Sequence, residues 1–223
     1  NNVYLEAVNL SIGVSGNDID IDSARDVDAN PSLTPVSTLT SSSYTNTHII
    51  ETVGNLYLYT VSTVDGIAYL MSSESILNGN PDGENIISGK TKLYAGGGIG
   101  EENNPIISNV GYLEGFSGGA QGIYLVNHGK METGSVSEMD GVSSNGPIYI
   151  TTTSPLVINE NIYTPLEIVL TASDSADDVQ ALLNSITAIA ELGGVTVMGP
   201  DGGPWTITFN NTGDVQELIS AIG

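Results

Sequence analysis

The sequence predicts a mainly β protein: an antiparallel sandwich or barrel with an extended N-terminal arm, followed by a small α+β module. Two observations predict the β part. Short stretches between residues 47 and 169 alternate apolar and polar side chains, and clusters of Gly, Asn, Asp and Pro separate these stretches. A third observation predicts the module, because the apolar spacing becomes helical near Leu170. We therefore expect three units, 1–46, 47–169 and 170–223.

The first unit contains two expected strands and an irregular arm. Val3–Leu10 alternates, and Asp18–Asp22 alternates Asp with Ile, which is typical of a half-buried strand with its carboxylates in water. Residues 26–44 lose this period and are rich in Ser and Thr. Because such a segment buries little of its own surface, we expect it to lie on a neighbouring subunit. The residues expected in that interface are Leu33, Val36, Leu39 and Tyr44.

The second unit contains the strands expected to form the sandwich or barrel. Short strands at this spacing, joined by glycine-rich turns, are typical of both folds. The expected strands are Ile49–Val53, Leu56–Thr63, Ile67–Met71, Thr91–Tyr94, Ile106–Leu113, Gly122–Asn127 and Pro147–Thr152.

The third unit is expected to fold as helix, strand, strand and helix. Ser173–Asp178 has the short polar residues and carboxylates that favour the start of a helix. The apolar residues that follow it keep a helical spacing up to Gly193, which ends the helix. The later elements are the strands Val195–Met198 and Trp205–Phe209 and the helix Asp214–Ile222.

The charge of the chain excludes several classes of partner. The 223 residues include 26 acidic and only 4 basic side chains, which gives a net charge of −22, and there is no cysteine. Four scattered cations cannot neutralise a nucleic-acid backbone or anchor the chain to an anionic membrane. Without cysteine there is no disulfide, thiolate metal site or cysteine nucleophile. We therefore expect neither nucleic acid nor a membrane among the partners.

A specific motif occupies the C-terminal unit. It consists of Ser175–Leu183, Gly194–Val197 and Gly199–Phe209, the last of which reads GPDGGPWTITF. This segment resembles a small module of tailed-phage structural proteins and some bacterial surface proteins, in which a capped helix precedes a "VTVxGxxGGPYTVTF" hairpin. Trp205 replaces the usual Tyr, and Met198 replaces the usual Thr or Ser. The match covers roughly a fifth to a quarter of the chain and implies a scaffold without known chemistry.

A second resemblance lies just before the module. Gly122–Val126 and Gly146–Thr153 are similar to segments of β-rich capsid-decoration and tail proteins, in which a "G-x-P-[VI]-Y" strand follows a short barrel. Together the resemblances imply a non-enzymatic virion protein, either a capsid decoration (cement) protein or a tail component. The implied partners are copies of the chain, as a trimer or higher homo-oligomer, and other virion proteins such as the major capsid protein.

An alternative function fits the same composition. Richness in Ser, Thr, Asn and Gly also suits a secreted surface-layer, filament or adhesin protein, located outside the cell or on its surface. In that case divalent cations would bridge carboxylates between subunits.

The densest carboxylate cluster is the candidate metal site. Its members are Asp18, Asp20, Asp22, Asp26 and Asp28. Hard cations such as Ca²⁺ bind several carboxylate oxygens, but alternate residues of a strand lie about 6.6 Å apart, too far for one ion to share the first three. The pattern favours a hydrated or interface surface, with a Ca²⁺ site as the alternative. No other cofactor is expected.

No group of residues indicates catalysis. Gly115–Gly119 fits the "G-x-S-x-G" pattern, but a strand rather than a helix follows it. Gly89-Lys90-Thr91 lacks the first glycine of a phosphate-binding loop. We therefore expect no catalytic residue. Six tyrosines fall in expected strands and favour core and subunit contacts, with carbohydrate stacking as the alternative. They are Tyr57, Tyr59, Tyr69, Tyr94, Tyr124 and Tyr149.

Overall fold

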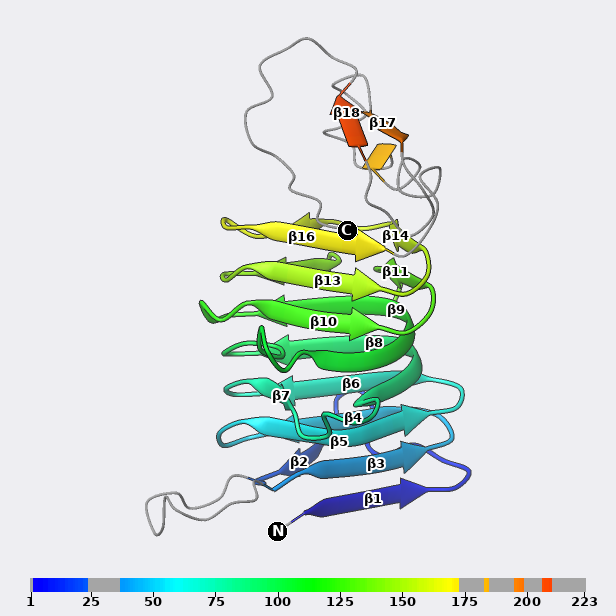
Figure 1. Ribbon diagram of the computed structural model, residues 1–223. Helices are drawn as coiled ribbons and strands as arrows, with labels where there is room; N and C mark the ends of the chain where they lie inside the picture. Colours follow the sequence, from blue (N-terminus) through cyan, green and yellow to red (C-terminus); the bar gives the residue numbers. More distant parts are fainter. Residues whose placement is uncertain (1, 24–36, 173–182, 185–194, 199–205, 210–223) are drawn as a thin grey trace.

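The chain winds into a parallel β-solenoid, in which each strand pairs with a strand of the next coil (Figure 1). The computed structural model describes residues 2–23, 37–172, 183–184, 195–198 and 206–209. Sixteen described strands belong to one sheet, and two more form a separate hairpin. Every strand pair in the large sheet is parallel. The prediction of an antiparallel sandwich or barrel is therefore wrong.

The strands of the solenoid are short except for two near its middle. They are β1 (Val3–Ala7), β2 (Ile19–Ile21), β3 (Leu39–Ser43), β4 (Thr47–Glu51), β5 (Leu56–Thr63), β6 (Ile67–Ser72), β7 (Ile76–Asn78), β8 (Ile86–Ala95), β9 (Ile106–Ser117), β10 (Ile123–Asn127), β11 (Met131–Thr133), β12 (Val142–Ser144), β13 (Ile148–Thr152), β14 (Leu156–Ile158), β15 (Ile162–Tyr163) and β16 (Ile168–Ala172).

Most predicted strand positions are confirmed, and β5 has the predicted bounds. The error concerns the partners. Alternation shows which side chains face inward, and this pattern is the same whether a strand pairs with its neighbour in a hairpin or with the next coil.

Two long strands join the faces of the solenoid. The start of β8 pairs with β5, and the remainder, Lys90–Ala95, pairs with β6. Strand β9 pairs along its length with β8, and different parts of it pair with β10, β11 and β12. One ladder of eight strands therefore runs from β1 to β16 through β3, β5, β8, β9, β10 and β13.

The core contains a column of similar apolar side chains, one per coil. In this column Leu and Ile residues stack directly through strand pairs and isolated bridges, and all but the last are buried. Its members are Leu56, Ile76, Ile99, Ile123, Ile148 and Ile168. Each member covers the one before it, so apolar surface leaves water only when successive coils stack in register.

The expected N-terminal arm is partly a strand. Residues 39–43 form β3, which pairs with β1 and β5 inside the sheet. Leu39, expected at an interface, is fully buried in the core of its own chain. Residues 24–36, which include Leu33 and Val36, lie outside the described residues.

The expected helical C-terminal module is also corrected: every element in the described part of the chain is a strand, and helical backbone is described only at Leu183 and Asn184, too short to count as a helix. Strands β17 (Val195–Met198) and β18 (Thr206–Phe209) pair antiparallel as a hairpin. Most residues of the two expected helices lie outside the described ranges. Within those ranges no helix has the length and apolar character needed to cross a bilayer.

Buried polar side chains hold the corners of the coils. Asn127 is fully buried at the end of β10, and its Oδ1 accepts hydrogen bonds from the Val110 amide at 2.8 Å and the Ser108 hydroxyl at 2.9 Å. Its Nδ2 donates to the carbonyls of Val110 and Gly129. One side chain thus satisfies backbone groups of two coils that would otherwise be buried without partners.

We expect Asn127→Ala to lower the free energy of unfolding by about 2–4 kcal/mol, because it leaves buried backbone groups unpaired. Asn109→Ala is the matched control, since Asn109 is exposed on the neighbouring strand β9 and should change stability by less than about 0.5 kcal/mol. Urea denaturation followed by circular dichroism measures both. Equal losses in the two variants would show that the corner hydrogen bonds contribute nothing specific.

Candidate functional site

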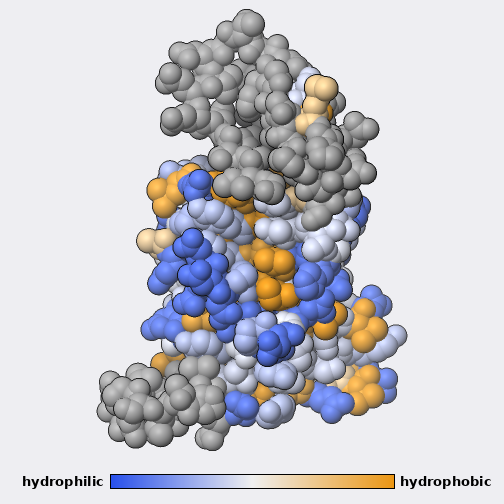
Figure 2. All heavy atoms as spheres, in the orientation of Figure 1, coloured by the Kyte–Doolittle hydropathy of each residue, from blue (hydrophilic) through white to orange (hydrophobic). Residues whose placement is uncertain are grey.

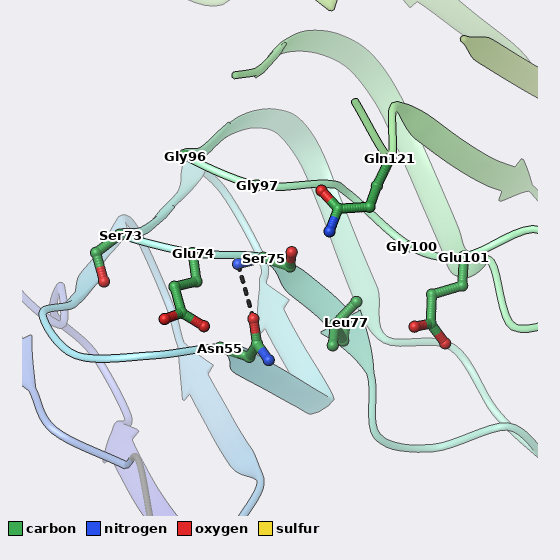
Figure 3. A pocket seen from close by; sticks show the side chains of 10 residues that line it. All are labelled: Asn55, Ser73, Glu74, Ser75, Leu77, Gly96, Gly97, Gly100, Glu101 and Gln121. Carbon is green, nitrogen blue, oxygen red and sulfur yellow. Dashed lines mark hydrogen bonds between the residues drawn. The ribbon is translucent and has the colours of Figure 1, made fainter. Parts of the chain in front are cut away.

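A cavity with a volume of about 370 Å³ lies where turns of successive coils meet (Figure 3). Its lining comes from the residue before β5, the β6–β7 turn, strand β7, the β8–β9 connection and Gln121, just before β10. The lining residues are Asn55, Ser73, Glu74, Ser75, Leu77, Gly96, Gly97, Gly100, Glu101 and Gln121.

Hydrogen bonds between coils shape the floor of this cavity. The Ser75 amide donates to Oδ1 of Asn55 at 2.9 Å, and the Gly97 amide donates to the Glu74 carbonyl at 2.7 Å. Gly96 is required here, because a Cβ at this position would lie 2.2 Å from the Ser73 carbonyl oxygen. Close stacking of the turns therefore depends on glycine.

The lining is polar and acidic. It contains amides, hydroxyls and two exposed carboxylates, Glu74 and Glu101, with Leu77 as its one aliphatic side chain. Figure 3 shows these two carboxylates at opposite ends of the row of lining residues. They do not face each other, so they do not form the carboxylate pair of a glycosidase. The cavity suits a small hydroxylated or cationic ligand.

The predicted metal cluster is only partly described. Asp20 in strand β2 and Asp22 just after it are exposed, while Oδ1 of Asp18 lies 3.2 Å from Nδ1 of His48. Asp26 and Asp28 lie outside the described residues. In the part that is described, no group of three or more His, Asp or Glu side chains is arranged to hold a metal ion. The Ca²⁺ site stays a prediction.

The remaining predicted residues lie in different environments. Tyr44, expected at an interface, has 47% of its surface exposed. Ser117, the serine of the "G-x-S-x-G" pattern, is fully buried in β9 and donates to the Gly97 carbonyl at 2.7 Å. Its hydroxyl is therefore part of the coil-to-coil contacts and cannot reach a substrate. His128 lies 3.2 Å from Glu84 at the surface.

Two fully buried carboxylates were missed by the sequence analysis. Glu51 accepts hydrogen bonds from the amide and hydroxyl of Ser23, and Glu114 accepts from the amides of Val136 and Ser137. Each carboxylate thus holds a loop against the sheet. The alternation of Ile49–Val53 could have identified Glu51, because it places position 51 on the inward face beside Ile49.

Comparison with models of known protein families, with curated proteins and with solved structures found no match for this chain.

Burial raises the pKa of Glu51 above its ordinary value of 4.5, and the hydrogen bonds from Ser23 oppose this only in part. A carboxyl with a raised pKa binds its proton more tightly in the folded state, so its contribution to stability falls as pH rises through the folded pKa. We therefore expect the loss in unfolding free energy caused by Glu51→Gln to be larger near pH 5 than near pH 7.5.

Glu132→Gln is the control for this experiment. The hydrogen bond from Lys130 lowers the pKa of Glu132, so its contribution to stability is lost only below its ordinary pKa of 4.5. The effect of Glu132→Gln should therefore be the same at both pH values. Urea denaturation of the wild type and both variants checks this, and a cost of Glu51→Gln that grows with pH would contradict the assignment.

Proposed function

We propose that this protein is a non-enzymatic structural component of a tailed-phage virion, either a capsid decoration protein or a tail component. The observation that carries the proposal is the continuous ladder of parallel strands from the first described coil to the last. One column of directly paired residues crosses the whole solenoid, from Leu5 to Ala172. Such a stack is a stiff rod that can connect or brace other proteins.

The stiffness follows from the bonding between coils. Each coil is joined to the next by a row of backbone hydrogen bonds and by a layer of buried side chains. To separate two coils, all the hydrogen bonds of that row must break at once and the apolar column must be exposed to water. The coils therefore resist a load as a cooperative unit. A particle component under internal pressure or shear requires this property.

The surface also suits an assembly. Figure 2 shows a mostly hydrophilic face with separate apolar patches. A net charge of −22 keeps free subunits hydrated and discourages their binding to packaged DNA. Three apolar side chains of the first coil are largely exposed, Tyr4 at 70%, Val8 at 72% and Leu10 at 73%. Their position at one end of the solenoid supports contacts with further copies or with the major capsid protein.

The C-terminal hairpin supports the virion setting. β17 and β18 pair from Val195 with Phe209 to Met198 with Thr206, where the phage-type motif predicts a hairpin. The residue correspondence of that motif is the link between a generic solenoid and a tailed phage.

A secreted surface-layer, filament or adhesin protein is the second candidate. The exposed carboxylates of Asp20 and Asp22 favour it, because they lie in the first coil, at one end of the described solenoid. Divalent cations bridging these carboxylates would join subunits end to end.

An antiserum against the purified protein tests the proposal. On phage particles purified from the source culture, we expect stoichiometric labelling in immuno-electron microscopy and an immunoreactive band that stays with the particles after treatment with a chelator. Antigen absent from particles and present on the cell surface, with release by the chelator, would contradict the virion assignment and establish the second candidate.

A further inference from the structure

Three neighbouring strands present a regular patch of side chains on the outer surface of the solenoid. Along β8 every second residue, Lys90, Lys92 and Tyr94, faces outward and is half-buried. In β6 the paired residues are Ile67, Tyr69 and Met71, and in β9 they are Tyr112, Glu114 and Phe116. We call Lys90, Lys92, Tyr69, Tyr94, Tyr112 and Phe116 the basic–aromatic patch.

Both lysines of the patch lie over aromatic rings. The Nζ of Lys90 lies 5.6 Å from the ring centroid of Tyr112, and the Nζ of Lys92 lies 5.4 Å from that of Tyr69. Among the described residues neither lysine makes an ion pair, whereas Lys130 pairs with Glu132 at 2.6 Å. The two ammonium groups therefore keep their capacity to bind an external anion.

The nearest carboxylates are engaged elsewhere. Glu114 pairs in register with Lys92, but it is buried and accepts hydrogen bonds from the Val136 and Ser137 amides at 2.9 and 2.7 Å. Asp18 lies against His48, whose ring packs edge-on against Tyr69 at 5.4 Å. Glu132 pairs in register with Tyr112, but its carboxylate forms an ion pair with Lys130 at 2.6 Å and accepts a hydrogen bond from Asn159 at 2.7 Å. In a chain with a net charge of −22, the patch thus combines two adjacent lysines that form no ion pair among the described residues.

The aromatic rings add flat apolar surface beside the charge. Tyr94 and Phe116 pack with centroids 4.9 Å apart and planes tilted by 31°, next to Lys92 along the strands. Tyr112 and Tyr69 flank the lysines on the strands to either side. A ligand that fits must carry negative charge and also offer apolar ring faces to tyrosine and phenylalanine.

We propose that the basic–aromatic patch binds an acidic oligosaccharide, a chain of sugar rings that carry carboxylates. The lysines bind the carboxylates, and the aromatic side chains contact the C–H faces of the rings. The two lysines lie about 6.6 Å apart along β8, so flexible side chains can contact charges on neighbouring sugars. Nucleic acid is disfavoured, since two cations cannot offset its charge density against an acidic protein. This activity is independent of the structural role proposed above.

Isothermal titration calorimetry of the full chain with tetragalacturonate tests the proposal, with neutral cellotetraose as the comparison ligand. We expect saturable binding of tetragalacturonate that weakens with salt, and no binding of cellotetraose. The double variant Lys90→Gln/Lys92→Gln should weaken binding by at least about tenfold. Lys130→Gln is the control variant. Lys130 lies at the edge of the patch beside Tyr112, but its ammonium group is already paired with Glu132, so its loss should change the affinity by less than about twofold.

Circular dichroism and urea denaturation establish that the variants fold. The proposal is overturned if folded wild type does not bind tetragalacturonate, if cellotetraose binds equally well, or if the double variant binds as tightly as wild type. It is also overturned if Lys130→Gln loses as much affinity as the double variant. Sedimentation velocity tests whether the patch instead joins two copies of the chain. Self-association that the double variant abolishes, together with no glycan binding, would contradict the proposal.

Discussion

The structure depends on one constraint, the parallel stacking of successive coils in register. Leu5 is connected to Ala172 through six intermediate residues, each paired directly with the next. Because side chains alternate along a strand, a shift of one residue in any pair would turn the buried column outward. Register therefore determines the core, the position of every corner turn and the composition of each outer face.

The polar features of the molecule follow from this stacking. Turns of neighbouring coils lie close together, so their buried backbone groups need hydrogen-bond partners. The side chains of Asn127, Glu51 and Glu114 accept hydrogen bonds from such backbone amides. The same register places the outward residues of β6, β8 and β9 side by side and thereby assembles the basic–aromatic patch from three separate segments. The stiffness of the solenoid and the basic–aromatic patch both result from the parallel pairing of successive coils, and both proposals depend on that pairing.

Local features could be predicted from the sequence, while the partners of the strands could not. Alternation located most strands, including β5 at its full length, and the Val195–Met198 strand was predicted with its observed bounds. The column residues Leu56, Ile76, Ile99, Ile123, Ile148 and Ile168 are separated by 20, 23, 24, 25 and 20 residues. These unequal intervals hide the repeat, because turns accept insertions without disturbing the stack. The basic–aromatic patch could not be predicted for the same reason, since its residues become neighbours only when β6, β8 and β9 pair between coils.

Pairs of spin labels measure the stacking most directly, and the chain has no cysteine to interfere with labelling. Glu6 and Asn109 are separated by four strand spacings, and Glu6 and Thr171 by about seven. With about 4.8 Å per spacing, Glu6→Cys/Asn109→Cys and Glu6→Cys/Thr171→Cys should give backbone separations of about 19 Å and about 34 Å, before the length of the labels is added. A separation for the second pair that equals or falls below the first would contradict the solenoid.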